Sequence, residues 1–460
     1  LNARWSQRGN FISIPTDCPQ RDERLGWMGD AQIFIRTATY NMDVAAFFTK
    51  WMTDVEDAQS ERGAFADTSP RLKDNPNFEA APGWGDAGII VPWTIWWVYG
   101  DTRIVERHWD AMIKWMDFLH DTNPDLLRRR NLNNNYGDWL SIRADTPKDL
   151  LATAYWAYDA SLMADMARAI GRNDEALKYE RLFTDVRGAF QREFVDADGR
   201  VYPVHGARGN TGMDASGTER SGDGGETQTN YVLALYFDLV PKPLREKAVE
   251  HLVDNIRKRG RHLSTGFIGV RHLNPVLTDA GRTDLAYQLL TQETYPSWLY
   301  PVKNGATTIW ERWDGWTEEK GFQNPGMNSF NHYALGSICE WLYESVAGIL
   351  PDPGTPAYKK IMIHPRPDAS LDFARASYES IHGRIESGWA RKGDTLLLDV
   401  VIPVNTSAAV YIPADGNTEV MEGGAPAAAS VGVTFLRREN GFAVYEVGSG
   451  RYRFESRVTF

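Results

Sequence analysis

The chain has 460 residues, of which 42% are hydrophobic and 24% are charged, and this balance is typical of a globular protein large enough for two domains. Its net charge of −11 argues against nucleic acid or an anionic membrane surface as a partner, and no basic stripe offsets that charge. No apolar run reaches the length of a membrane span, so we expect no membrane insertion.

The two cysteines, Cys18 and Cys339, are too few for a disulfide framework, although a single bridge between them remains open. The sequence has no Cys/His spacing typical of a metal site, and we expect no metal and no cofactor. The chain begins with Leu1 and has no signal-peptide pattern, so we expect a cytoplasmic protein. An exported form remains open because the sequence looks like a fragment, and the oligomeric state is not readable.

From about residue 28 to residue 347 the sequence has a helical pattern. In three segments, residues that suit a buried helix face recur at steps of three or four: Ile33, Thr37, Tyr40, Val44, Phe47, Trp51 and Val55; Val105, Trp109, Met112, Met116 and Leu119; and Leu151, Tyr155, Tyr158, Leu162, Met166 and Ile170. Further helices are expected near 174–194, 226–239, 243–259, 275–291 and 328–347. About ten successive helices indicate an all-α domain. A flat stack and a closed double ring both fit, and the alternation of Trp- and Asp-bearing loops with plainer ones favours the ring.

Residues 200–227 are rich in Gly, Ser, Thr and Asp and predict a long loop. Its acidic residues leave a calcium site open, although their spacing is not that of a known calcium loop: Asp214, Glu219, Asp223 and Glu226. After residues 351–354 the pattern changes to short alternating segments typical of strands: 361–363, 395–402, 408–412, 431–436, 442–447 and 452–454. We therefore expect a helical domain over 1–350 and a small antiparallel β-sandwich over 351–460.

The first of two chemically unusual blocks spans residues 17–30 and places acidic side chains among arginines and a tryptophan. Asp30 comes just before the first long helix, so its carboxylate either caps that helix or binds a substrate. Asp17 and Glu23 either pair with the neighbouring arginines or belong to an active site. The first block alone leaves both interpretations open.

The second block spans residues 307–316, where Glu311 is flanked by Trp310 and Trp313. Apolar surroundings raise the pKa of a carboxylate, and indole faces offer flat surfaces for sugar rings. Glycoside hydrolysis needs one acid that protonates the leaving oxygen and one base or nucleophile opposite it. Two acidic, tryptophan-bearing blocks in one candidate helical barrel therefore favour hydrolysis of a glycosidic bond. His332 is either a capping or core histidine or a donor to a sugar hydroxyl.

At these residues the chain resembles the inverting α-L-rhamnosidases of glycoside hydrolase family 78. The resemblance covers nearly the whole chain, and its motifs are 5–11 leading into 17–30, 309–314, 383–389 and 402–406. It implies an (α/α)6 barrel for residues 1 to about 350, with Glu23 as general acid and Glu311 as general base. The residues expected to bind rhamnose, including the two tryptophans beside Glu311, are Asp17, Arg21, Trp27, Asp30, Trp84, Trp139, His332, Trp310 and Trp313.

The resemblance also implies a mechanism in which the two glutamates lie on opposite faces of the sugar. An inverting pair should lie about 6.5–9.5 Å apart, which leaves room for the attacking water, whereas a separation near 5 Å would contradict the assignment. Family members usually carry β-domains upstream of the barrel that this chain lacks, which leaves a short or absent first barrel helix open.

Two other functions compete with this one. Another (α/α)6-barrel carbohydrate enzyme, such as a glucosidase, an unsaturated uronyl hydrolase or a polysaccharide lyase, is the nearer alternative. Arg21 and Arg312 leave a clamp for a uronate carboxylate open, whereas a lyase would need a Tyr/His base. A truncated, non-catalytic rhamnose-binding protein is the alternative from a different class. The group to which the rhamnose is attached is not readable from the sequence.

Overall fold

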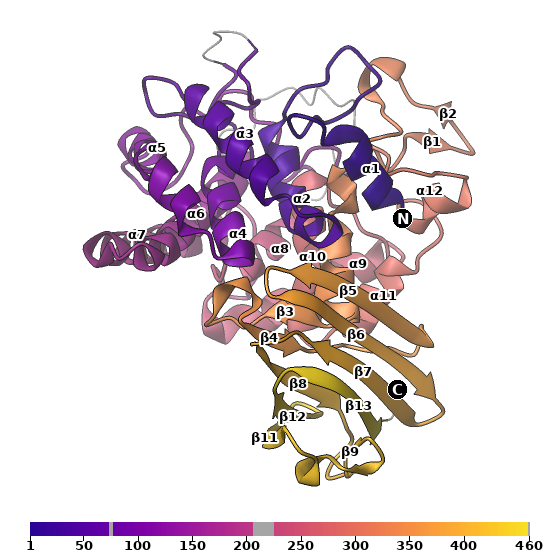
Figure 1. The fold of residues 1–460 in the computed structure, drawn as a ribbon. Helices are drawn as coiled ribbons and strands as arrows, with labels where there is room; N and C mark the ends of the chain where they lie inside the picture. Colours follow the sequence, from indigo (N-terminus) through magenta and orange to yellow (C-terminus); the bar gives the residue numbers. More distant parts are fainter. Residues whose placement is uncertain (73–76, 206–224, 459–460) are drawn as a thin grey trace. The chain divides into compact units, whose positions relative to one another are not determined.

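The computed structural model describes residues 1–72, 77–205 and 225–458, which form two compact units (Figure 1). The first unit holds residues 1–38, 44–94 and 102–338, and the second holds 39–43, 95–101 and 339–460 within that described part. The first is helical and the second is rich in strands. Both cysteines are free. No helix in the described ranges combines the length and the apolar character needed to span a bilayer.

The helical unit is the expected (α/α)6 barrel. Its helices are α1 (Asn2–Asn10), α2 (Met28–Asn41), α3 (Ala45–Asp57), α4 (Ala87–Tyr99), α5 (Thr102–Thr122), α6 (Lys148–Ala169), α7 (Asn173–Phe194), α8 (Gln228–Tyr236), α9 (Arg245–Lys258), α10 (Phe267–Asp279), α11 (Thr283–Leu290) and α12 (Leu299–Lys303). Helices α2, α4, α6, α8 and α10 are buried around most of their circumference, whereas α3, α5, α7 and α9 bury one face only. This alternation is what an inner ring wrapped by an outer ring requires.

The sixth pair of the ring joins the two ends of the helical unit. Helix α1 contacts the short 3-10 helix η3 (Ala334–Ser337). The buried face of α1 is Ala3, Ser6, Gln7 and Asn10, which is mostly polar. Apolar periodicity therefore gave no sign of this helix, and it is present although short.

Three helix predictions were wrong in their limits. The periodic run from residue 33 to 55 is two helices, because α2 ends at Asn41 and α3 begins at Ala45. The expected helix over 275–291 spans parts of α10 and α11, with Gly281 at φ +71° between them. Residues 328–333 precede η3 and are not helical, so His332 does not begin a helix. Helix α4 was missed because it is apolar all round and contains Pro92, which together hide the helical period.

The strand-rich unit contains two sheets with the strand orders β10-β9-β13-β7-β6-β5 and β11-β12-β8-β4-β3. The strands are β3 (Ile349–Pro351), β4 (Lys360–Ile363), β5 (Phe373–Ser380), β6 (Gly383–Lys392), β7 (Thr395–Ile402), β8 (Ser407–Pro413), β9 (Met421–Glu422), β10 (Ala425–Pro426), β11 (Val433–Glu439), β12 (Phe442–Val447) and β13 (Gly450–Arg457). All neighbours are antiparallel except β4 and β8, which run parallel. The six expected strands are present, and five were missed: β5, β6 and the short strands β3, β9 and β10.

Most of the long loop predicted over 200–227 lies outside the described residues. Three of the acidic residues considered for calcium, Asp214, Glu219 and Asp223, fall there. Glu226 is described, and its carboxylate pairs with Arg200 at 3.2 Å.

Candidate active site

A pocket of about 210 Å³ in the helical unit brings the two acidic blocks together. Nine of the eleven residues predicted for the site line it. The whole lining is Asp17, Arg21, Glu23, Trp27, Asp30, Trp84, Tyr136, Trp139, Phe267, Glu311, Met327 and His332. The volume equals that of about seven liquid water molecules, which is the scale of a single sugar ring.

The loop that carries the first acidic block is closed by Asp17. Its backbone N–H donates to the carbonyl of Leu25, and the N–H of Leu25 donates back to Asp17 Oδ1, both at 3.0 Å. Cys18 Sγ donates to the other carboxylate oxygen at 2.9 Å. Burial raises the pKa of Asp17 to about 7, against the opposing charge of His332. Asp17 therefore fixes the loop from which Arg21 and Glu23 reach the pocket.

Arg21 binds both predicted catalytic glutamates at the same time. Its Nε donates to Glu23 Oε2 at 2.8 Å, and its Nη1 donates to Glu311 Oε2 at 2.7 Å. Trp27 Nε1 donates to the remaining oxygen of Glu23 at 2.7 Å. Glu311 is 3% exposed and Glu23 is 25% exposed, so the second glutamate lies deeper than the first. One guanidinium thus links two carboxylates that are 288 positions apart in the sequence.

The shared guanidinium also limits how far apart the two carboxylates lie. Nη2 of Arg21 is 2.6 Å from Glu23 Oε2 and 3.2 Å from Glu311 Oε1, so these two oxygens are at most 5.8 Å apart. The separation of about 6.5–9.5 Å expected of an inverting pair is measured between whole carboxyl groups, so this limit applies to two of their oxygens only. Arg21 Nη2 thus takes up one hydrogen-bonding site on each of the two glutamates.

Asp30 and His332 form a buried pair that lines the pocket, with Asp30 Oδ1 at 3.0 Å from His332 Nε2. Asp30 is the third residue of α2, so it lies inside the helix and is not its N-cap. Burial raises the pKa of Asp30. Burial alone would lower the pKa of His332, but the hydrogen bond to Asp30 and the charges of Asp30, Glu311 and Asp17 raise it above its usual value. His332 is therefore held as a hydrogen-bond donor.

The position of Glu311 and His332 follows from backbone pairing between the second block and residues 329–332. The N–H of Glu311 donates to the carbonyl of Ser329 at 2.8 Å, and the N–H of His332 donates to the carbonyl of Ile309 at 2.9 Å. This pairing places both side chains on the pocket.

Four aromatic side chains form one wall of the pocket, and Tyr136 lies in contact with the other three. Its ring centroid is 4.6 Å from that of Trp84, 5.4 Å from that of Trp27 and 6.0 Å from that of Trp139. Its hydroxyl donates to the buried carboxylate of Asp67 at 2.9 Å. Sequence reasoning missed Tyr136, although it lies three residues before Trp139 in the same Gly/Asp-bearing string.

Trp84 can reach the pocket because residue 29 has no side chain. A Cβ on Gly29 would lie 2.5 Å from the indole ring of Trp84, closer than real atoms approach. The indole N–H of Trp84 is buried and has no hydrogen-bond partner in the described protein.

Phe267 and Met327 also line the pocket, and the sequence gave no functional signal for either. Phe267 begins α10, whose N-terminus is held by the buried carboxylate of Asp138. That carboxylate accepts the N–H groups of Gly266, Ile268 and Gly269 at 2.8–3.1 Å. The N–H of Phe267 donates to the carbonyl of Trp139 at 2.9 Å. Asp138 therefore holds the start of α10 so that Phe267 lies at the pocket. The hydrogen bond from Phe267 in turn holds the backbone of Trp139, the other pocket residue of this contact.

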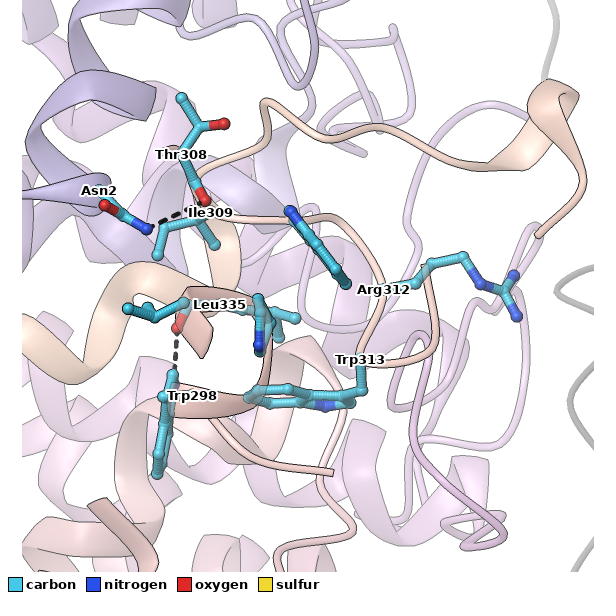
Figure 2. Close-up of a pocket in the computed structure, with 10 residues that line it drawn as sticks. Asn2, Trp298, Thr308, Ile309, Arg312, Trp313 and Leu335 are labelled. Carbon is cyan, nitrogen blue, oxygen red and sulfur yellow. Dashed lines mark hydrogen bonds between the residues drawn. The ribbon is translucent and has the colours of Figure 1, made fainter. Parts of the chain in front are cut away.

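The structure differs from the prediction for Trp310 and Trp313, which do not line this pocket. They line a separate cavity of about 20 Å³, which has room for about one water molecule and none for a sugar ring (Figure 2). Trp313 is buried, and its indole N–H donates to the carbonyl of Thr265 at 2.9 Å. Trp310 is also buried and packs edge-on against Phe330. Both support the loop that presents Glu311.

Asp17, Cys18 and Glu23 are close enough together to share a metal ion in the described part of the chain. Burial raises the pKa of the Cys18 thiol, which keeps it protonated, and Arg21 already occupies Glu23. Metal binding requires a thiolate and a free carboxylate, so this group does not suit a metal.

The barrel and its carboxylate-lined pocket define a six-hairpin glycosidase domain. The family described as the bacterial alpha-L-rhamnosidase 6 hairpin glycosidase domain matches residues 1–346, and the bacterial alpha-L-rhamnosidase C-terminal domain matches residues 348–425. The chain therefore belongs to the bacterial alpha-L-rhamnosidase family.

Individual relatives agree with this assignment. The chain is 45% identical over 453 residues to an alpha-L-rhamnosidase of Streptomyces avermitilis, and 40% identical over 423 residues to one of Formosa agariphila. These alignments cover 98% and 90% of this chain but 40% and 43% of the relatives, so the chain spans less than half of their length.

Solved structures give the same result. The structure of the Streptomyces avermitilis enzyme complexed with L-rhamnose superposes with a TM-score of 0.88 at 44% identity, over 99% of this chain and 40% of that one. The enzyme from Aspergillus terreus superposes with a TM-score of 0.84 at 31% identity, over 100% of this chain and 49% of that one.

Proposed function

We propose that this chain is the catalytic part of an inverting α-L-rhamnosidase, which releases terminal α-L-rhamnose from glycosides or polysaccharides. The observation that carries the proposal is the pocket in which Glu23 and Glu311, held by Arg21, face a space the size of one sugar ring. The family membership and the solved structure of a relative with L-rhamnose support the choice of sugar.

In the proposed mechanism, Glu23 donates a proton to the glycosidic oxygen while the bond to the anomeric carbon breaks. Glu311 takes a proton from a water molecule, which attacks the opposite face and inverts the anomeric centre. The carboxylates of Asp17 and Asp30, together with Glu311, stabilise the positive charge that develops on the sugar ring. The aromatic wall supplies an apolar surface for the methyl group of this 6-deoxy sugar.

Arg21 shifts in this mechanism, because it donates to both oxygens of Glu311, the group that has to accept a proton from water. The arginine is 15% exposed at the pocket and uses Nε, Nη1 and Nη2 on the two glutamates. A bound sugar presents hydroxyl oxygens that accept hydrogen bonds. We expect them to take over some of these N–H donors and to leave one carboxylate free for the water.

The test is hydrolysis of p-nitrophenyl α-L-rhamnopyranoside by the wild type, Glu23→Gln and Glu311→Gln. The matched control is Glu61→Gln, which alters an exposed glutamate outside the pocket. We expect Glu311→Gln to lower kcat by about 10²–10⁴-fold, the usual contribution of a general base. Glu23→Gln should lose less on this substrate, because nitrophenolate needs little protonation, and more on an alkyl rhamnoside.

The product decides the stereochemistry. Proton NMR during turnover should show β-L-rhamnose first, and initial release of the α-anomer would refute inversion. A folded wild type that binds L-rhamnose in a calorimetric titration without hydrolysing any rhamnoside would support the non-catalytic alternative. A wild type that neither binds nor hydrolyses would refute the choice of sugar.

A further inference from the structure

A second hollow in the helical unit has a volume of about 920 Å³, more than four times that of the pocket. The function proposed above does not use it. Seven of its fifteen lining residues are charged, and two are tyrosines. We call this hollow the groove.

The groove and the pocket share their walls. Four short segments each contribute one residue to the pocket and a nearby residue to the groove. These pairs are Trp139 and Arg143, Phe267 and Leu263, Glu311 and Arg312, and Met327 and Gln323. In each of the four segments the two linings are at most four residues apart, which places the groove close to the pocket.

Glu311 and Arg312 show most clearly how neighbouring residues line the pocket and the groove separately. Glu311 faces the pocket, whereas the side chain of Arg312 extends away from the small cavity around Trp313 (Figure 2). In the groove its Nε and Nη2 donate to the carboxylate of Asp314 at 2.9 and 3.2 Å, and Gln323 Nε2 donates to the same carboxylate at 3.0 Å. This side of the groove is therefore an ordered network of planar polar groups.

Two tyrosines add aromatic surface to the groove. The rings of Tyr295 and Tyr300 lie 5.8 Å apart at 68° and are both partly exposed. Arg259 holds the neighbouring loop by donating to the carbonyls of Ile142 and Arg143. Flat aromatic faces beside fixed polar groups suit sugar rings, which have apolar faces and hydroxyl edges.

The charges of the groove select among ligands. Four cationic side chains, Arg143, Arg259, Arg312 and Lys320, lie with three carboxylates, those of Asp314, Glu318 and Glu319. This near balance suits a neutral chain better than a polyanion. A flat apolar aglycone would remove these charged groups from water without replacing their hydrogen bonds, which is unfavourable.

We propose that the groove binds the neutral oligosaccharide to which the terminal rhamnose is attached. This inference rests on the proposed function, because it assigns the groove to the part of the substrate on the far side of the scissile bond.

The experiment compares p-nitrophenyl α-L-rhamnopyranoside with neutral oligosaccharides of two and four sugars that end in α-L-rhamnose. A rhamnosylated flavonoid and a rhamnosyl tetrasaccharide that contains uronates serve as competing substrates. For the wild type we expect kcat/KM to rise at least 10-fold from the disaccharide to the tetrasaccharide. Tyr300→Ala and Gln323→Ala should remove most of that rise, and activity on the nitrophenyl rhamnoside should stay within 2-fold. Tyr202→Ala is the matched control, because Tyr202 is partly exposed and lines neither hollow.

Unchanged chain-length dependence in both variants would overturn the proposal, and so would a preference for the flavonoid or the uronate chain that these variants abolish. If the wild type does not hydrolyse the nitrophenyl rhamnoside, the proposed function fails separately. The groove is then tested by calorimetric titration with the neutral trisaccharide that lacks rhamnose. We expect weaker binding to Tyr300→Ala than to the wild type, and an absence of binding to the wild type would refute the groove.

Discussion

Replacing Tyr136 with Phe should destabilise the protein in a pH-dependent way, because it removes the hydroxyl donor to Asp67 and keeps the ring. Asp67 is fully buried and accepts the Tyr136 hydroxyl at 2.9 Å and the Ala81 N–H at 3.1 Å. Burial raises the pKa of Asp67 from 3.8 to about 7. Between these two values the folded state binds more protons than the unfolded state, so the stability of the wild type falls as pH rises through this window.

The sign for the variant follows from which form of Asp67 needs the donor. Above pH 7 the carboxylate is ionised, and a hydrogen bond to a charged group contributes about 1.5–3 kcal/mol. Below pH 7 the group is protonated, and a neutral hydrogen bond contributes about 0.5–1.5 kcal/mol. The loss caused by Tyr136→Phe should therefore be larger at pH 9 than at pH 5.5 by about 1.4 kcal/mol, which corresponds to a further rise of about one unit in the pKa of Asp67.

Thermal unfolding at pH 5.5 and pH 9, followed by tryptophan fluorescence, measures this difference. Tyr179→Phe is the matched control, since the hydroxyl of Tyr179 is buried without a hydrogen-bond partner in the described protein. The control should be neutral or slightly stabilising at both pH values. An equal loss for Tyr136→Phe at both pH values, or a larger loss at pH 5.5, would refute the role assigned to Asp67.

Three further substitutions test the site and its support. Gly29→Ala should displace the indole of Trp84, since the new Cβ would lie 2.5 Å from it, and this should raise KM for the nitrophenyl rhamnoside about 5- to 10-fold. The control is Gly188→Ala, in a helix with space around it, which should leave KM unchanged. Trp313→Phe loses a buried hydrogen bond and should cost about 1–3 kcal/mol in thermal unfolding with KM within 2-fold, whereas a large rise in KM would return Trp313 to the sugar site. Arg128→Met leaves its fully buried aspartate partner unpaired and should cost about 3–5 kcal/mol; a loss under 1 kcal/mol would contradict that pairing.

The general architecture could be predicted from the sequence, because amphipathic helices and alternating strands show their hydrophobic periodicity directly. Helix α5 is an example, with its predicted apolar face buried. Helix α4 and helix α1 escaped for opposite physical reasons. One is apolar all round, and the other buries polar side chains, so neither has the contrast between faces on which periodicity depends.

The candidate site was predictable only as a set of residue types. Glu23 and Glu311 were found because acids beside tryptophans are chemically unusual. That Arg21 would bridge them depends on the closure of the barrel, which no local pattern encodes. Proximity in sequence misled for Trp310 and Trp313, because the chain bends and turns at 311–313 and directs these two side chains to a separate cavity. Tyr136 was missed because its role depends on Asp67, 69 positions away.

The contacts that close the barrel also position Glu311 in the site. The segment that presents Glu311 is tied to α1 by polar contacts: Asn2 Nδ2 donates to the carbonyl of Ala306 at 2.9 Å, and Ser6 Oγ accepts the N–H of Ile309 at 2.9 Å. Asn10 Nδ2 donates to Asn331 Oδ1 at 3.2 Å. Polar side chains suit this contact between α1 and residues 306–331, because hydrogen bonds are directional and set the relative position of the two segments. Apolar contacts are not directional. The position of Glu311 relative to Glu23 therefore depends on the hydrogen bonds made by the buried polar side chains of α1.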